Sequence, residues 1–232
     1  MLYLIPTPIG NLKDITLRSL EVLQNVDGII CEDTRRTSLL LNHYQIQKPL
    51  LVLNDYNEGK TFPQIIEKLK SGQNLALVSD AGTPLISDPG YKLVRQCLAD
   101  GLEVDSLPGP SSVITALTLS GLPPDKFLFL GYPPEKGGQR LKLFEGLCVH
   151  LRGGKLNLGT IIMFVSPYKL LKILQDMKDV FGDIEVVLAH ELTKIHQSVE
   201  KSKISDWLEN LSPPAGKPKG EYILLFRLNP EV

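Results

Sequence analysis

Residues able to do chemistry gather directly after four apolar runs in the first half of the chain. The longest group, residues 79–90, holds two Asp, two Ser, two Gly and two Pro, and a loop of this length in a compact domain is usually functional. The other groups are residues 7–12, 32–35 and 108–112. Their carboxylates could accept a proton, and the guanidinium of Arg35 could clamp a phosphate. Taken singly, the shorter groups also fit plain turns or the start of a helix.

The segments between these groups must position them, and they alternate short apolar runs with helix-period stretches. We expect strands at residues 3–5, 28–31, 50–53, 75–78 and 103–107. Between them we expect helices at residues 16–23, 37–43, 62–70 and 91–98, the first capped by Asp14. This alternation predicts an α/β fold with a parallel sheet and crossover helices. Because loops that follow parallel strands share the carboxyl edge of the sheet, the four groups should meet at one crevice.

The alternation of apolar runs and helix-period stretches ends at Pro108. Proline and glycine then interrupt the chain twice before residue 127. We place a domain boundary in this stretch and expect two domains, residues 1–115 and 116–232. The second domain should hold strands at residues 127–130, 160–165, 184–189 and 222–228. Its helices should lie near residues 141–147, 168–181 and 204–211.

Composition and missing motifs exclude several classes of protein. The chain carries 25 Lys and Arg against 26 Asp and Glu, which excludes a uniformly basic nucleic-acid coat protein. No apolar run approaches the roughly 20 residues of a membrane helix, and no secretory signal is visible, so the cytoplasm is the expected location. The three cysteines form no CxxC pair, and we expect no metal site. The absence of a well-placed GxGxxG or P-loop disfavours dinucleotide dehydrogenases and kinases.

Four motifs occur in order along the first half: Thr7–Leu12, Glu32–Arg35, Ser79–Gly90 and Pro108–Ser111. Together they resemble the 16S ribosomal RNA cytidine-2′-O-methyltransferases, a family of the tetrapyrrole methylase superfamily. The resemblance continues through three later segments, so it covers nearly the whole chain: Ser120–Pro123, Glu191–Lys194 and Lys219–Glu221.

The resemblance implies a two-domain α/β fold with an N-terminal parallel sheet, a C-terminal mixed sheet and a cofactor cleft between the domains. The implied reaction is S-adenosylmethionine-dependent 2′-O-methylation of a cytidine ribose. The implied partners are 16S ribosomal RNA or the small ribosomal subunit, and a second copy of the chain in a homodimer. Matched motif positions place cofactor contacts at Ile9, Gly10, Asp80, Gly82, Thr83, Ile86, Ser111, Ser112, Val165 and Leu192.

Methyl transfer to a ribose hydroxyl needs a group that orients the hydroxyl or accepts its proton. The candidate acceptors in this chain are Glu32, Asp33 and Asp80. Lys194 could orient the hydroxyl or a phosphate. Glu32 and Asp33 equally fit the start of the next helix, where a carboxylate stabilises the exposed N–H groups, so both roles stay open.

Contact with RNA must come from local groups, because the net charge of −1 supplies no overall attraction. The candidate substrate contacts are Asn11, Arg35, Lys136 and Arg140. The last two form a basic cluster with Lys142, although a solvated surface would carry such a cluster as well.

The second half departs from the family pattern, and this leaves alternatives open. In Phe164–Lys169 a Glu is missing, and Tyr168 and Lys169 replace His and Arg. His190 and Gln197 stand where the family has Arg and Glu. One alternative is a methylase of a tetrapyrrole or another small molecule, although the first loop lacks the Asp-bearing Gly-Pro-Gly turn of those enzymes. The other is a cofactor-binding, ribosome-associated protein without catalysis.

Overall fold

The computed structural model describes residues 1–54, 58–152, 159–211 and 218–228. The chain forms two compact units, Met1–Ser111 and Ser112–Val232. The boundary expected between residues 115 and 116 falls inside the first helix of the second unit, α5 (Ser112–Leu119). In the described part of the chain, no helix is both long and apolar enough to cross a membrane.

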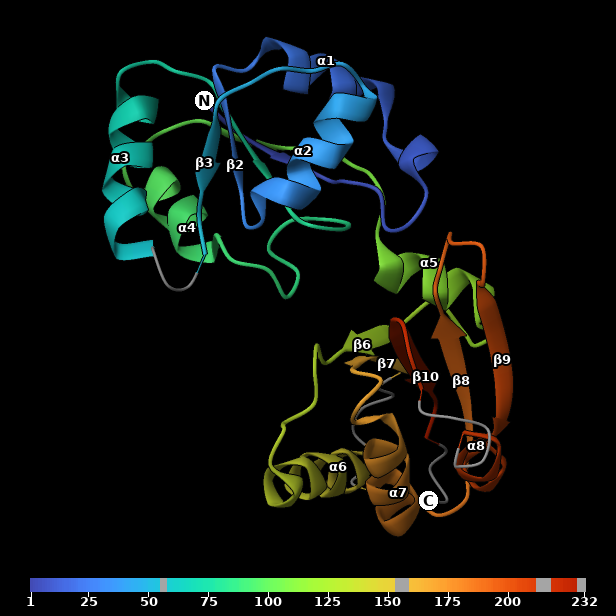
Figure 1. The fold of residues 1–232 in the computed structure, drawn as a ribbon. Helices are drawn as coiled ribbons and strands as arrows, with labels where there is room; N and C mark the ends of the chain where they lie inside the picture. Colours follow the sequence, from blue (N-terminus) through green and yellow to red (C-terminus); the bar gives the residue numbers. More distant parts are fainter. Residues whose placement is uncertain (55–57, 153–158, 212–217, 229–232) are drawn as a thin grey trace. The chain divides into compact units, whose positions relative to one another are not determined.

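The first unit is built on a five-stranded parallel sheet with the strand order β3-β2-β4-β1-β5 (Figure 1). Its strands are β1 (Leu2–Ile5), β2 (Gly28–Cys31), β3 (Leu50–Val52), β4 (Leu75–Val78) and β5 (Val104–Ser106). Its helices are α1 (Leu17–Asn25), α2 (Thr34–His43), α3 (Glu58–Lys70) and α4 (Tyr91–Ala99), with a 3₁₀ turn, η1, at Leu12–Asp14. The predicted parallel sheet with crossover helices is therefore confirmed.

Helices cover both faces of this sheet, which explains why its strands are nearly all apolar (Figure 1). Successive strand residues point to opposite faces. Ala76 and Val78 pack in the cluster that includes Leu23 of α1 and Leu40 of α2. Leu75 and Leu77, the alternate residues of β4, pack instead in the cluster that α3 and α4 complete with Ile65, Leu69, Leu93 and Cys97.

The predicted cap of the first helix is wrong. Thr16, not Asp14, is the N-cap of α1, and its Oγ1 accepts a hydrogen bond of 3.0 Å from the Ser19 N–H. Asp14 instead ends η1, which Asn11 caps by accepting from the Lys13 N–H. Both residue types can cap a helix, but the 3₁₀ turn takes up Asp14 as its last residue and leaves Thr16 at the start of α1.

The second unit holds a mixed five-stranded sheet with the order β6-β7-β10-β8-β9. Its strands are β6 (Phe127–Phe129), β7 (Thr160–Val165), β8 (Glu185–His190), β9 (Ser198–Lys203) and β10 (Tyr222–Phe226). β6 pairs parallel with β7, and the other neighbours pair antiparallel. The helices after α5 are α6 (Gly137–Arg152), α7 (Leu170–Phe181) and α8 (Ile204–Asn210).

The core of the second unit lies between its sheet and the helices α6, α7 and α8 (Figure 1). Phe144 of α6, Leu174 of α7 and Phe226 of β10 are fully buried there. The sequence analysis missed β9, whose residues Ser-Val-Glu-Lys-Ser-Lys carry little apolar character. β9 forms because it pairs with β8 at the edge of the sheet, where both of its faces can stay polar.

Candidate active site

The loops that follow β1, β4 and β5 are hydrogen-bonded to one another at the carboxyl edge of the parallel sheet. Thr7 and Gly82 exchange two backbone hydrogen bonds of 2.9 Å each. Thr7 Oγ1 donates to the Ser79 carbonyl at 3.0 Å, and Ser79 Oγ donates to the Gly82 carbonyl at 2.7 Å. Thr83 Oγ1 donates to the Pro110 carbonyl at 3.0 Å, which joins the loop after β5 to the other two.

The first turn of α2, which directly follows β2, meets the same edge through an ion pair. Arg36 Nε lies 3.4 Å from Asp80 Oδ2. The predicted convergence of the four sequence groups is therefore confirmed within the first unit. The loops approach one another closely because glycine occupies the contact points. A Cβ added at Gly82 would lie 3.3 Å from Ile9 Cγ2, and one added at Gly109 would lie 2.8 Å from Pro6 Cβ.

Backbone strain marks the loop of residues 79–90. Leu85 has a φ of 72° and Ser87 a φ of 67°, both in the left-handed region that L side chains rarely adopt. Each such residue costs on the order of 1–3 kcal/mol, and residues of this kind cluster at ligand sites. The strain therefore supports the functional interpretation of this loop.

Asp80 is the central acid of this edge. Its Oδ1 is buried and has no hydrogen-bond partner among the described residues, while Oδ2 faces Arg36. Burial raises the pKa of the Asp80 carboxyl, and the nearby Arg36 charge opposes that rise. A buried acceptor without a donor is costly, so the site suits a ligand that brings a hydroxyl or amino group to Oδ1.

Asp33 takes the capping role that the sequence left open. It is the N-cap of α2, and its Oδ1 accepts a 2.9 Å hydrogen bond from the Arg35 N–H. The Arg35 guanidinium also donates to both carboxylate oxygens, at 3.0 and 2.7 Å. These hydrogen bonds from Arg35 lower the pKa of Asp33 to about 2. A carboxylate held this firmly in its charged form is a poor proton acceptor.

Asp88 is a candidate that the sequence analysis missed. Burial raises the pKa of its carboxyl to about 6, and the negative charges of Glu32 and Asp80 add to the rise. A carboxyl with a pKa close to neutrality is suited to proton transfer. The sequence indicated Asp88 only through its place in the long loop of residues 79–90. Residue types do not tell how far burial raises the pKa of Asp88 as against that of Asp80.

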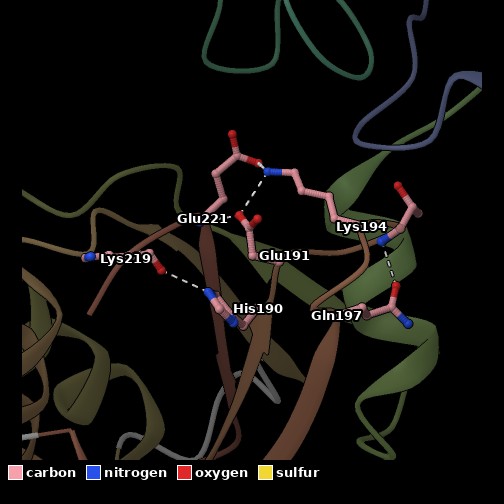
Figure 2. A network of polar contacts seen from close by, with 7 residues as sticks. His190, Glu191, Lys194, Gln197, Lys219 and Glu221 are labelled. Carbon is pink, nitrogen blue, oxygen red and sulfur yellow. Dashed lines mark hydrogen bonds and ion pairs between the residues drawn. The ribbon is translucent and has the colours of Figure 1, made fainter. Parts of the chain in front are cut away.

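In the second unit, Lys194 is held between two carboxylates (Figure 2). Its Nζ lies 2.9 Å from Glu191 Oε1 and 3.0 Å from Glu221 Oε2. Burial lowers the pKa of Lys194, but the hydrogen bonds to Glu191 and Glu221 outweigh that effect and raise the pKa overall. Lys194 therefore stays protonated at neutral pH.

Backbone groups of the neighbouring segment, residues 219–221, also contact Glu191 and His190. The Glu221 N–H donates to Glu191 Oε1 at 2.9 Å, and a Cβ added at Gly220 would lie 2.7 Å from the same oxygen. His190 Nε2 is hydrogen-bonded to the Lys219 carbonyl at 2.8 Å (Figure 2). The His190 ring also stacks on Tyr222 with 4.3 Å between ring centroids. Gln197 Oε1 accepts from the Thr193 N–H at 2.6 Å. The two departures from the family pattern, His190 and Gln197, therefore both have local partners.

The prediction that Arg140 contacts substrate is wrong. Its side chain is 1% exposed, and its guanidinium is paired with Asp176 of α7. Nη1 also donates to the carbonyls of Pro134 and Glu135, at 2.9 and 3.1 Å. All these partners lie within the second unit, so Arg140 is a structural ion pair, whereas Lys136 of the same predicted cluster is exposed.

Comparisons with known proteins decide the family. Residues 1–207 match the tetrapyrrole (corrin/porphyrin) methylases. The chain is 46% identical to a ribosomal RNA small subunit methyltransferase I of Thermotoga maritima over 97% of both chains. It is 45% identical to the protein of the same name in Escherichia coli O157:H7, over 97% of this chain and 76% of that one. The chain belongs to the ribosomal RNA small subunit methyltransferase I family.

Solved structures agree on the fold of this methyltransferase family. A diphthine synthase covers 98% of the chain with a TM-score of 0.71 at 14% identity, over 89% of its own length. A cobalt precorrin-4 methyltransferase covers 97% with a TM-score of 0.69 at 18% identity, over 93% of its own length. The predicted two-domain tetrapyrrole-methylase fold is therefore confirmed. Methylases of this family use S-adenosylmethionine, as predicted.

The residues carried over from the methyltransferase family differ in their exposure to solvent. In the first unit, Ile9 is buried against Gly82, Gly10 is exposed, and Ile86 is 46% exposed. Ser111 and Ser112 are half-buried beside Pro110. Val165 at the end of β7 and Leu192 after β8 are buried in the second unit.

Proposed function

We propose that this methyltransferase transfers the methyl group of S-adenosylmethionine to the ribose 2′-hydroxyl of a cytidine in 16S ribosomal RNA. The observation that carries the proposal is 46% identity over 97% of both chains to a ribosomal RNA small subunit methyltransferase I. The geometry of the first unit supports it, since four loops join at one sheet edge around a buried carboxylate oxygen without a partner.

We propose that the joined loops hold the cofactor. Asp80 Oδ1 would accept from a cofactor hydroxyl or amino group, Ile86 would offer apolar contact, and Thr83 keeps the loop on Pro110. The other proposed contacts are Ile9, Gly10, Gly82, Ser111, Ser112, Val165 and Leu192. When bound, S-adenosylmethionine supplies an electrophilic methyl group on a sulfonium.

The chain's own part of the reaction is to orient the ribose hydroxyl and to take up its proton. Glu32 and Asp88 are the proposed acceptors, because Asp33 is held in its charged form by Arg35. A pKa of about 6 leaves Asp88 largely ionised at neutral pH and still basic enough to take a proton. Lys194, anchored by two carboxylates, would orient the hydroxyl or a neighbouring phosphate through its fixed charge.

RNA contact is proposed for Asn11, Arg35 and Lys136, which are all exposed. A ribosomal RNA substrate places the reaction in the cytoplasm, and we propose that the active form is a homodimer. Light scattering on the purified protein tests the dimer: a mass near 51 kDa supports it, and the 25.7 kDa of one chain overturns it.

The test of the reaction is transfer of label from tritiated S-adenosylmethionine to small ribosomal subunits that lack 2′-O-methylcytidine. Nuclease digestion and nucleoside analysis then identify the product. Label in 2′-O-methylcytidine supports the proposal. Cofactor binding by calorimetry without labelled RNA overturns it, and leaves a small-molecule methylase or a non-catalytic binding protein.

A further inference from the structure

A small cavity of about 100 Å³ lies beside the joined loops of the first unit. Its polar end carries Arg36 and Asp80, and its apolar walls include Pro8, Leu12, Leu39 and Leu40. Two of these walls face solvent, because Leu12 is 39% and Leu39 72% exposed. The cavity therefore combines apolar walls with a few polar groups, as small-molecule sites commonly do.

The walls of the cavity are held in place by the fold. The hydroxyl of Tyr44, at the end of α2, donates to the Leu12 carbonyl at 2.5 Å, which ties η1 to the helix that carries Leu39. Leu40, one residue further along α2, is buried in the core. The cavity is therefore a formed feature between η1 and α2 rather than a gap between loose side chains.

Arg36 can still bind a ligand. The 3.4 Å from its Nε to Asp80 Oδ2 is a charge contact longer than a normal hydrogen bond, and the side chain is 60% exposed. A guanidinium has five N–H donors in a rigid fork, so the pairing leaves donors for a planar group with two adjacent acceptors. Neighbouring Arg35 differs, since its guanidinium is bonded to both oxygens of Asp33.

The cavity shares part of its lining with the proposed cofactor loops, through Thr7 and Pro8 after β1 and Ser79 and Asp80 after β4. The proposed cofactor contacts in the first unit follow β1, β4 and β5, which are neighbours in the sheet. The cavity lies between the loop after β1 and α2, the helix that follows β2 on the other side of β4. Asp80 stands between them, with Oδ1 unpartnered and Oδ2 facing Arg36. This is the position that an acceptor nucleotide needs beside its methyl donor.

We propose that this cavity binds the base of the target nucleotide, and that Arg36 selects cytosine by donating to N3 and O2 of its edge. The inference rests on the proposed function. Cytosine presents two adjacent acceptors at N3 and O2, which match the guanidinium fork. Uracil carries a hydrogen on N3, so an N–H of the Arg36 guanidinium would face the N3–H of uracil and form no hydrogen bond. Leu12 and Leu39 would contact the apolar faces of the ring.

The experiment compares Arg36→Met with its matched control Arg35→Met, which removes the same charge from the same helical turn. After the methylated position has been mapped with the wild-type protein, subunits are reconstituted with cytidine or uridine there, and kcat/KM is measured on both. We expect the wild type to favour cytidine at least tenfold, the size typical of a two-bond contact to a base edge. We expect Arg36→Met to lose most of that preference. Arg35→Met should retain the preference even though it weakens RNA binding, because a proposed phosphate contact affects both substrates equally.

Two further measurements separate this proposal from its competitors. Arg36→Lys keeps the charge but not the fork, so it should retain RNA affinity and lose the preference. Calorimetry with S-adenosylmethionine alone should give the same Kd for all variants within twofold. An unchanged preference in Arg36→Met, equal loss with both bases, or a tenfold weaker cofactor Kd overturns the proposal. Failure of the wild type to methylate cytidine at all would instead overturn the proposed function.

Discussion

At the scale of single residues, Asp88 shows how burial changes the chemistry of a carboxyl. Its pKa in the folded protein is about 6, above the ordinary 3.8, so folding favours the protonated form. The stabilisation that this provides is complete below pH 4 and is lost as the pH rises through 6. The free energy of unfolding of Asp88→Asn, relative to that of the wild type, should therefore be about 1–2 kcal/mol higher at pH 8 than at pH 4. This figure allows for solvent screening of the carboxylate.

Urea unfolding of both proteins at the two pH values measures this gain. The exposed Glu209→Gln variant is the control and should show no such difference. If Asp88 also takes the ribose proton, Asp88→Asn loses methyl transfer even though it is the more stable protein at pH 8. A variant whose stability relative to wild type is the same at both pH values would contradict the raised pKa.

Arg140 was predicted from its charge to contact substrate, but it is buried and paired with Asp176. Removing it leaves Asp176 and two carbonyls without their donor inside the second unit. Arg140→Ala should lower the free energy of unfolding by about 3–5 kcal/mol, the usual cost of breaking a buried ion pair. Chemical denaturation checks this figure. Lys136→Ala, the exposed neighbour, should leave stability nearly unchanged, and the reverse pattern would show that Arg140 is a surface group.

At the scale of elements, α2 contributes its first turn to the carboxyl edge of the parallel sheet. Asp33 caps this helix and Arg36 reaches Asp80 from it. Asp33→Ala should speed hydrogen exchange at the Arg35 amide, because that N–H loses its acceptor. Asp33→Asn keeps an acceptor at the cap and should retain methyl transfer. Loss of transfer in the Asn variant with normal exchange would mean that Asp33 is the proton acceptor after all.

The turn that joins β8 to β9 and the segment before β10 hold the proposed site residue Lys194. Gly220 has a φ of 82°, and an added Cβ would meet Glu191 at 2.7 Å. Gly182 has a similar φ of 78°, but a Cβ there meets nothing within 4 Å. Both Ala variants should lower the free energy of unfolding by roughly 1–3 kcal/mol, because a positive φ strains an L side chain. Gly182, with a ψ of −165°, lies in a region almost confined to glycine. Only Gly220→Ala should also lose methyl transfer, about tenfold or more, because it displaces Glu191 and with it Lys194.

Rates of methyl transfer and thermal unfolding of the two glycine variants test this pairing. Equal losses of activity in Gly220→Ala and Gly182→Ala would show that strain alone matters and that the Lys194 network is not part of the site.

At the scale of the whole molecule, the charge balance makes RNA binding a local property. The net charge is −1, so attraction to phosphates depends on a few exposed cations such as Lys136. The KM for small subunits should rise steeply with salt, while the Kd for the cofactor should change little. Lys136→Met should reduce the slope of log KM against log salt by about 1 if that residue contacts one phosphate. An unchanged slope would remove Lys136 from the interface.

Much of the fold could be predicted because its signals are local. The apolar strands of the parallel sheet were placed within a residue or two, as with Leu75–Val78. The edge strand β9 was missed because its residues Ser198–Lys203 are polar, and only pairing with β8 makes them a strand. The cap of α1 was misplaced because Asp14 and Thr16 are both good caps, and the turn that chooses between them depends on neighbouring contacts.

The α/β architecture and the meeting of the motif segments at one sheet edge could be predicted from residue type and strand direction, and the family from the resemblance of the motifs. Which charged groups are engaged in structural contacts became known from the folded chain alone. Arg140 and Asp33 are engaged in structural contacts, whereas burial raises the pKa of Asp88, and Arg36 rather than Arg35 reaches Asp80. The reason is physical: burial and ion pairing depend on distances between residues far apart in the chain, and spacing along the sequence does not carry those distances.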